Sequence, residues 1–198
     1  MKKIPTAFVR VFDGHKIVDV LNQYTNDACR EAVLHGIPTI KWDGAACMVN
    51  GAGLFKRIDM AKAKKPANSE VILCQQFPDE VTGHWPAWIN CRRQEPSDKW
   101  FFAAYNNYFD QPERELPMRG TFEAVGPHFQ GNPYQLQEDT LIPHGKDFAH
   151  LKNYGRGIIG IRDFLRDHEV EGIVFWLNGH PVCKIKRTDF GLPWPIKK

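Results

Sequence analysis

Two apolar runs joined by Asn178-Gly179 near the carboxyl end constrain the fold more than any other feature of the sequence. Residues 171–176 and 181–187 are rich in β-branched and other apolar side chains. Asn-Gly readily adopts the positive φ angles of a type I′ turn, whose twist matches that of two antiparallel strands. The sequence therefore predicts a β-hairpin here, and a fold that contains antiparallel pairing.

The remaining elements are predicted from periodicity and turn residues. A second hairpin is expected around Asp13-Gly14, and a helix over 28–35 is expected to start at Asn26 or Asp27 and to end at Gly36. Further strands are predicted at 38–42, 47–50, 53–57, 119–125 and 140–142, and further helices at 100–109 and 158–165. This order lacks a βαβ rhythm, which predicts an α+β fold with largely antiparallel sheets.

Length and composition fit an ordinary globular protein. The 198 residues predict a single domain over 1–198, and 42% hydrophobic residues supply a core. A net charge of +3 permits a nucleic-acid partner without requiring one. The five cysteines are widely spaced with no CxxC pair, which argues against a disulfide framework or a zinc site. With no signal peptide and no long apolar run, we expect a cytoplasmic protein without membrane contact.

The segment Lys41-Trp42-Asp43-Gly44 is the first candidate for chemistry. A neutral lysine amine can attack the α-phosphorus of a nucleoside triphosphate, and neighbouring cations or partial burial favour the neutral form of a lysine in general. A glycine three residues later would let a phosphate approach the backbone. Taken alone, the segment is more typical of an exposed turn.

Lys184 and Lys186 stand two residues apart on a predicted strand and so point to one face. Two ammonium groups on one face would bind a triphosphate and stabilise the charge that develops as phosphorus is attacked. The alternative is a solvated hairpin edge, where lysines are common.

Two carboxylates and one guanidinium are the remaining candidate site residues. Glu171 opens the C-terminal hairpin and Glu123 lies in the predicted strand over 119–125. Carboxylates beside a phosphate site can bind magnesium or accept hydrogen bonds from ribose hydroxyls. Arg57 ends a predicted strand that could return beside Lys41, where it would hold a phosphate or ribose. Each of the three also fits a surface charge.

In order, the motifs are Lys-x-Asp-Gly, Phe-Lys-Arg, Phe-Glu-Ala-Val-Gly, Glu-Gly-Ile-Val and Lys-Ile-Lys. This ordered set resembles the covalent nucleotidyltransferase superfamily, which comprises ATP- and NAD-dependent polynucleotide ligases and mRNA capping enzymes. The resemblance runs from Lys41 to Lys186, nearly three quarters of the chain. It implies a DNA ligase-type, ATP-grasp-like adenylyltransferase domain with antiparallel sheets around a nucleotide cleft.

The resemblance also implies roles. Lys41 would form lysyl-AMP from ATP, with Mg²⁺ or Mn²⁺ neutralising the triphosphate. Arg57 would hold the ribose or the phosphate of an RNA end, and Glu123 would contact the ribose. Glu171 would bind the metal or orient Lys41, and Glu123 is a second candidate metal ligand. Lys184 and Lys186 would contact the α-phosphate and assist the departure of pyrophosphate.

Members of the superfamily stack the base on an aromatic residue that follows the glutamate. Phe129, Tyr134, His144 and Phe148 lie in the matching stretch. We take His144 and Phe148 as the two candidates, although a single histidine is more often structural.

One departure from the superfamily pattern narrows the kind of enzyme that the chain resembles. About a dozen residues follow Lys186, too few for the OB-fold module of roughly 70 residues that capping enzymes and most DNA ligases carry there. The chain resembles minimal RNA ligases instead, which implies an RNA substrate with 5′-phosphate and 3′-hydroxyl ends. The sequence does not indicate an oligomeric state.

Basic and aromatic residues could supply the RNA contact. They are Lys62, Lys64, Lys65, Arg92 and Arg93, with Trp85 and Trp88 nearby. A solvated loop over a tryptophan-anchored core explains this stretch equally well. Three functions stay open at this point: an RNA ligase, a nucleotidyltransferase that modifies another nucleic-acid end, and a non-catalytic nucleic-acid-binding module.

Overall fold

The computed structural model describes residues 1–61, 71–80, 82–110 and 118–196. The chain divides into two compact units. Residues 4–42 and 145–198 form the first, here called the hairpin unit, and residues 1–3 and 43–144 form the second, here called the six-stranded unit. The main chain passes between them at Lys3–Ile4, Trp42–Asp43 and His144–Gly145. The single-domain assignment of the sequence stays a prediction.

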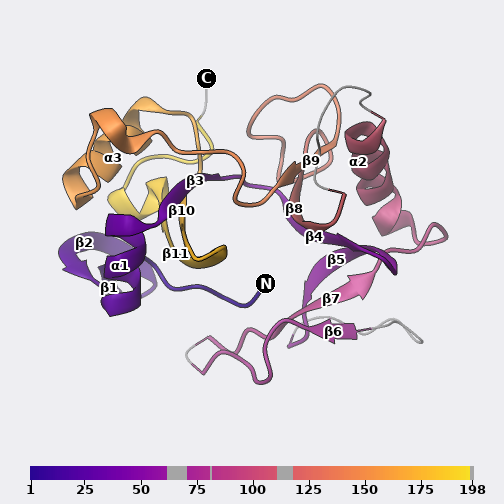
Figure 1. Ribbon diagram of the computed structural model, residues 1–198, viewed down its shortest axis with the longest axis horizontal. Helices are drawn as coiled ribbons and strands as arrows, with labels where there is room; N and C mark the ends of the chain where they lie inside the picture. Colours follow the sequence, from indigo (N-terminus) through magenta and orange to yellow (C-terminus); the bar gives the residue numbers. More distant parts are fainter. Residues whose placement is uncertain (62–70, 81, 111–117, 197–198) are drawn as a thin grey trace. The chain divides into compact units, whose positions relative to one another are not determined.

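The hairpin unit is built on a three-stranded antiparallel sheet in the order β11-β10-β3 (Figure 1). Its strands are β3 (Ile37–Lys41), β10 (Gly172–Leu177) and β11 (His180–Lys186). Asn178 and Gly179 have φ angles of 51° and 76°, as a type I′ turn requires. The predicted C-terminal hairpin is therefore confirmed, and its inner strand also pairs with β3.

Short elements surround this sheet. They are the hairpin strands β1 (Phe8–Asp13) and β2 (Lys16–Tyr24), helices α1 (Asp27–His35) and α3 (Ile158–Asp167), and the 3-10 turns η2 (Leu151–Asn153) and η3 (Arg187–Phe190). The side chain of Asn26 accepts a hydrogen bond from the backbone N–H of Cys29 at 2.8 Å, which makes Asn26 the N-cap of α1. The predicted helices over 28–35 and 158–165 and the predicted N-terminal hairpin are confirmed.

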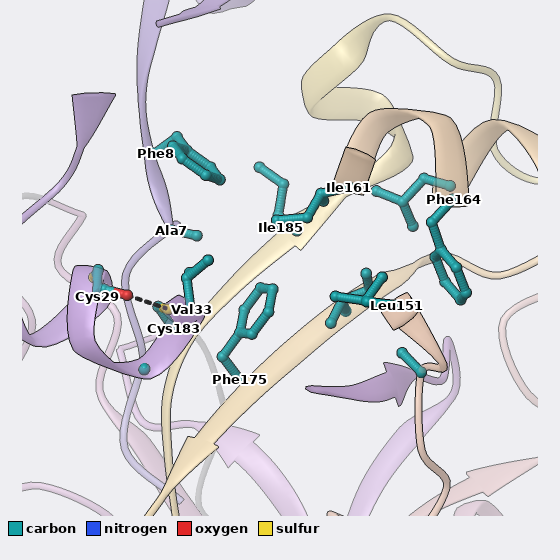
Figure 2. Close-up of a cluster of buried hydrophobic side chains, with 14 residues drawn as sticks. Ala7, Phe8, Cys29, Val33, Leu151, Ile161, Phe164, Phe175, Cys183 and Ile185 are labelled. Atoms are coloured by element: carbon teal, nitrogen blue, oxygen red, sulfur yellow. Dashed lines mark hydrogen bonds between the residues drawn. The ribbon is translucent and has the colours of Figure 1, made fainter. Parts of the chain in front are cut away.

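The core of the hairpin unit lies on one face of the three-stranded sheet. Alternate residues of β10 and β11, among them Ile173, Phe175 and Ile185, are fully buried there. Helices α1 and α3 contribute Val33 and Phe164 to the same cluster (Figure 2). Because side chains alternate along a strand, the lysines of β3 and β11 are directed to the opposite face.

The six-stranded unit contains an antiparallel sheet in the order β6-β7-β5-β4-β8-β9. The strands are β4 (Ala45–Asn50), β5 (Gly53–Asp59), β6 (Val71–Leu73), β7 (Pro86–Asn90), β8 (Gly120–Val125) and β9 (Thr140–Pro143). The turn η1 (Pro96–Asp98) leads into helix α2 (Lys99–Phe109). Phe101, Ala104 and Tyr108 of α2 pack against one face of the sheet, where Cys47 and Phe122 are buried.

Every strand pairing of the described sheets is antiparallel, and helices and strands are mixed along the chain. The predicted α+β class with largely antiparallel sheets is confirmed. No helix in the described part of the chain is both long and apolar enough to span a bilayer.

Candidate active site

Three predicted site residues meet at the face of the three-stranded sheet that lies opposite the core of the hairpin unit. The Lys41 ammonium forms an ion pair with Glu171 Oε2, and the Lys186 ammonium pairs with Glu171 Oε1 at 2.5 Å. The Glu171 side chain is only 4% exposed, whereas those of Lys41 and Lys186 are 21% and 35% exposed. One buried carboxylate thus holds two lysines that reach solvent, and the cluster carries a net charge of +1. An anion would be attracted to this cluster.

The register of the sheet brings these three residues together. Gly172 is paired with Lys41 on one side and with Lys186 on the other. A Cβ atom on Gly172 would lie 2.2 Å from the carbonyl oxygen of Ile185, so only glycine allows this approach of the two strands. The Glu-Gly pair therefore places a carboxylate directly between the two lysine-bearing strands.

Lys184 and Phe148 share this face. Lys184 is two residues from Lys186 on β11, between the buried Cys183 and Ile185. Phe148 forms an antiparallel bridge with Thr39, which lies two residues before Lys41. Residues that oppose each other in an antiparallel pair project to the same side. The exposed ring of Phe148 therefore stands on the lysine face.

A second polar cluster lies within the six-stranded unit. Glu123 Oε2 is 2.9 Å from His144 Nε2, and Glu123 Oε1 accepts a hydrogen bond from the backbone N–H of Gly44 at 3.1 Å. His144 Nδ1 is buried and has no hydrogen-bond partner among the described residues. A Cβ atom on Gly44 would lie 2.1 Å from the carbonyl oxygen of Ala124. The glycine of the Lys-x-Asp-Gly segment is therefore required by packing against β8.

Arg57 lies on the same face of the six-stranded sheet as Glu123. Register pairs Met48 with both Phe55 and Thr121, and Arg57 and Glu123 each lie two residues further along their strands. Helix α2 covers the opposite face. Arg57 is exposed, so its guanidinium is accessible to a ligand.

The structure thus groups the predicted residues into two sets. Lys41, Glu171, Lys184, Lys186 and Phe148 belong to the hairpin unit, and Glu123, His144 and Arg57 belong to the six-stranded unit. The backbone joins the sets, because Lys41 and Gly44 are three residues apart in the chain.

Two of the other aromatic candidates are already engaged. Phe129 is 6% exposed and packs edge-on against Phe101 in the core of its unit. The hydroxyl of Tyr134 accepts a hydrogen bond from the backbone N–H of Asp43 at 2.6 Å. Neither ring is as available to a base as that of Phe148.

The suggestion that tryptophans beside Arg92 and Arg93 stack on RNA bases is wrong for Trp88. This residue is 3% exposed because it lies in β7, the second strand of the sheet. Arg93 stacks instead on Phe102, with the guanidinium carbon 4.6 Å from the ring centroid. Lys62, Lys64 and Lys65 lie outside the described residues.

Two pairs were not anticipated from the sequence. Lys56 Nζ lies 2.5 Å from the buried Asp98, and His128 Nδ1 lies 2.7 Å from the buried Asp139. Lys56 and Asp98 are 42 residues apart in the sequence and His128 and Asp139 are 11 apart, and neither pair forms a local motif. A Cβ atom on Gly126 would lie 2.6 Å from Asp139 Oδ1, so the glycine of Phe-Glu-Ala-Val-Gly makes room for the second pair.

Thiols near the two clusters are poor nucleophiles. Burial, followed by the charge of Glu123, raises the pKa of Cys47 well above its ordinary value. Burial also raises the pKa of Cys183, the residue before Lys184. Because the thiolate is the reactive form of cysteine, neither thiol is a candidate nucleophile for the site.

Comparison with known proteins points in the same direction. No protein-family model matches the chain. The chain is similar to curated proteins named RNA ligase 1: it is 26% identical to those of Pongo abelii and Mus musculus over 147 aligned residues, which cover 60% of this chain and 44% of each relative. The protein of the same name from Danio rerio is 26% identical over 146 residues. These similarities support a relationship to RNA ligases, and the chain spans less than half the length of these relatives.

Proposed function

We propose that the protein is an ATP-dependent RNA ligase, of the DNA ligase-type adenylyltransferase fold, whose first step attaches AMP to Lys41. One observation carries this proposal: a lysine at the end of β3 is held by a buried carboxylate that also holds a second lysine. A nucleophilic amine, an orienting carboxylate and a cation for phosphate are the groups that a lysine-dependent nucleotidyl transfer requires.

In the proposed step the Lys41 nitrogen attacks the α-phosphorus of ATP. The N–P bond forms, the bond from the α-phosphorus to the bridging oxygen breaks, and pyrophosphate leaves with that electron pair. The ammonium gives up one proton to solvent before attack, and the nitrogen gives up a second to solvent as the phosphoramidate forms. Glu171 orients the amine, and Lys186, together with Lys184 on the same face, stabilises the charge that develops on the phosphate oxygens.

The other predicted residues receive roles on chemical grounds. Glu123 would accept hydrogen bonds from the ribose hydroxyls, and Arg57 would hold a ribose or an RNA phosphate. Phe148 and His144 are the candidates for the adenine contact. Phe148 is favoured for stacking because its ring is exposed on the lysine face, whereas His144 is engaged by Glu123.

Magnesium fits this arrangement as an ion that accompanies the triphosphate. Among the described residues, no three His, Cys, Asp or Glu side chains lie together as a complete metal site would need. Mg²⁺ is usually bound through one or two carboxylates together with substrate phosphates and water, so Glu171 and Glu123 are its two candidate protein ligands. Both oxygens of Glu171 are paired with lysines, so Glu171 would have to release one of them to bind the ion. The ion, or Mn²⁺, would neutralise the triphosphate charge.

The later steps rest on the similarity to proteins named RNA ligase 1. AMP would pass from Lys41 to an RNA 5′-phosphate. A 3′-hydroxyl would then attack that phosphorus, forming a phosphodiester and releasing AMP.

The test is incubation of the purified protein with Mg²⁺ and α-³²P-labelled ATP or GTP, with intact-mass analysis for the gain of one AMP. We expect ATP to label the wild type, and Lys41→Ala to abolish labelling. Lys16→Ala, at an exposed lysine of the same unit, is the matched control and should label normally. Absence of label on a protein not already adenylated when purified would refute the proposal and favour a binding module.

A second assay separates ligation from end modification. A 5′-phosphorylated oligoribonucleotide should be converted to circular or joined product. Accumulation of adenylated RNA with no sealed product would indicate a nucleotidyltransferase that stops before sealing.

A further inference from the structure

The segment 146–156 of the hairpin unit is unusually basic. It carries three fixed cations, Lys146, Lys152 and Arg156, against one carboxylate, Asp147, for a net charge of +2 with His150 neutral. The carboxylate is engaged, because Asp147 Oδ2 accepts a hydrogen bond from Trp42 Nε1 at 3.0 Å. The segment therefore presents excess positive charge to solvent.

An open hollow of about 540 Å³ lies along this segment. Its floor is apolar and includes Pro38, Ala149 and Leu151, all buried. Phe148, the residue favoured above for the adenine contact, also lines the hollow, so the RNA site proposed below would adjoin the nucleotide. The volume of the hollow lies within the range of roughly 300–1,000 Å³ that is typical of small-molecule sites. The hollow can therefore accommodate a flat apolar group such as a nucleobase.

The rim of the hollow is cationic. His150, Lys152 and Arg156 line it, and none of the described residues that line it is acidic. Arg156 is fixed, because its Nη1 donates to the carbonyl oxygens of Val33 at 2.9 Å and Gly36 at 2.7 Å. Its Nε and Nη2 make no hydrogen bond within the described parts of the chain. The rim thus offers the preorganised guanidinium of Arg156 and the exposed ammonium of Lys152 to an anion.

This surface is connected to the strand that ends at Lys41. The backbone N–H of Ile40 donates to the carbonyl oxygen of Asp147 at 2.8 Å, and the backbone N–H of Ala149 donates to the carbonyl oxygen of Pro38 at 2.9 Å. Residues 147–149 therefore run antiparallel beside β3. The position opposite Phe148 is two residues from Lys41, a distance of about 7 Å along a strand.

We propose that this hollow and its basic rim bind a single-stranded stretch of the RNA substrate, beside β3, the strand that ends at Lys41. Phosphates of the strand would contact Lys152 and Arg156 on the rim and the exposed Lys146 further along the same segment, and one base would lie over the apolar floor. Cations beside an apolar surface are the combination by which proteins bind single-stranded nucleic acid. The identity of the partner rests on the proposed function, whereas the charge and shape of the surface do not.

The experiment measures binding of a fluorescent single-stranded, 5′-phosphorylated oligoribonucleotide to the full chain by anisotropy over a series of salt concentrations. Lys152→Glu and Lys146→Glu are compared with Lys16→Glu, a charge reversal at an exposed lysine on β2. At low salt we expect each of the first two changes to raise Kd about 5- to 10-fold and to lower the salt slope by about 0.7 per lost contact. The control should bind as the wild type does.

Labelling by ATP in the same variants distinguishes this proposal from the proposed function. Weakened RNA binding with wild-type labelling of Lys41 supports the surface as an RNA site. RNA binding that is unchanged in both variants overturns the proposal, as does a wild type that binds no RNA. Displacement of the RNA by polyglutamate at equal phosphate and carboxylate concentrations would also overturn it, since the surface would then be a general polyanion site. A wild type that binds RNA through Lys146 and Lys152 but takes no label would refute only the ligase assignment.

Discussion

Replacing Glu171 by glutamine tests the centre of the site, because it removes one charge and preserves shape. The cluster changes from +1 to +2, and two ion pairs are lost. A contacting pair is worth about 4 kcal/mol at an effective dielectric constant of 20. The lysines are 21% and 35% exposed, so solvent screening reduces each pair to roughly 1–2 kcal/mol. We expect Glu171→Gln to lower the free energy of unfolding by about 2–3 kcal/mol, since the amide oxygen still accepts one hydrogen bond.

Urea unfolding followed by tryptophan fluorescence measures this loss as a lower midpoint with an unchanged m-value. Lys186→Met supplies a double-mutant cycle. Glu171→Gln should cost about 1–2 kcal/mol less in that background, because one of the two pairs is already absent. Additive effects of the two changes would show that the carboxylate and Lys186 do not interact.

The Glu171→Gln variant also tests the role of this carboxylate in the adenylation of Lys41. Loss of the orienting carboxylate should slow Lys41 adenylation about 10²- to 10³-fold, by analogy with the removal of one preorganised group from an active site. The KM for ATP should not rise, since the more positive cluster attracts the triphosphate at least as strongly. Adenylation within threefold of the wild-type rate would refute the reasoning. Recovery of the rate at high Mg²⁺ would indicate that Glu171 acts as a metal ligand.

Three further predictions concern the fold. Asn26→Ala removes the N-cap of α1 and should cost about 1 kcal/mol, a fall of about 2–4 °C in Tm, whereas Asn106→Ala on the exposed side of α2 should cause no loss. Alkylation at pH 8 with peptide mapping should modify the partly exposed Cys74 before Cys91. Burial raises the pKa of Cys91 to about 12, so only about one Cys91 thiol in 10⁴ is ionised at pH 8. Rapid labelling of Cys91 in the native protein would contradict this prediction. Hydrogen bonds from the backbone N–H of Trp85 and from the His84 side chain lower the pKa of Asp59 to about 2 from an unfolded value of 3.8. The contribution of Asp59 to stability is therefore complete above about pH 4 and is lost as the pH falls toward 2. Asp59→Asn should flatten an acid-unfolding curve between these two pH values.

Local signals accounted for most of the fold. The turn chemistry of Asn178-Gly179, the cap at Asn26 and the strand periodicity around Lys184 and Lys186 each depend on neighbours in the chain, so the sequence was sufficient to predict them. The strand at Pro86–Asn90 was missed, because residues 85–88 place a proline between two tryptophans and this pattern fits several structures.

Long-range pairing accounts for what the sequence did not predict. Glu171 was expected to bind metal or to orient Lys41, but its simultaneous pairing with Lys186 depends on the register of β10 against two strands. The contacts of His128 with Asp139 and of Lys56 with Asp98 join residues that no local pattern relates. Gly44 was assigned to phosphate approach, whereas its packing against Ala124 is visible only once β4 and β8 are paired.

The hairpin unit is discontinuous, because residues 43–144 are inserted between β3 and β10. During synthesis β3 therefore leaves the ribosome about 130 residues before the carboxylate that pairs with Lys41. Closing a flexible loop of about 100 residues costs about (3/2)RT ln n, or roughly 4 kcal/mol, and any order that the inserted residues gain first reduces that cost. A nascent chain that has folded its six-stranded unit should thus complete the lysine cluster faster than one that has not, which makes the kinetics of site assembly sensitive to substitutions far from Lys41.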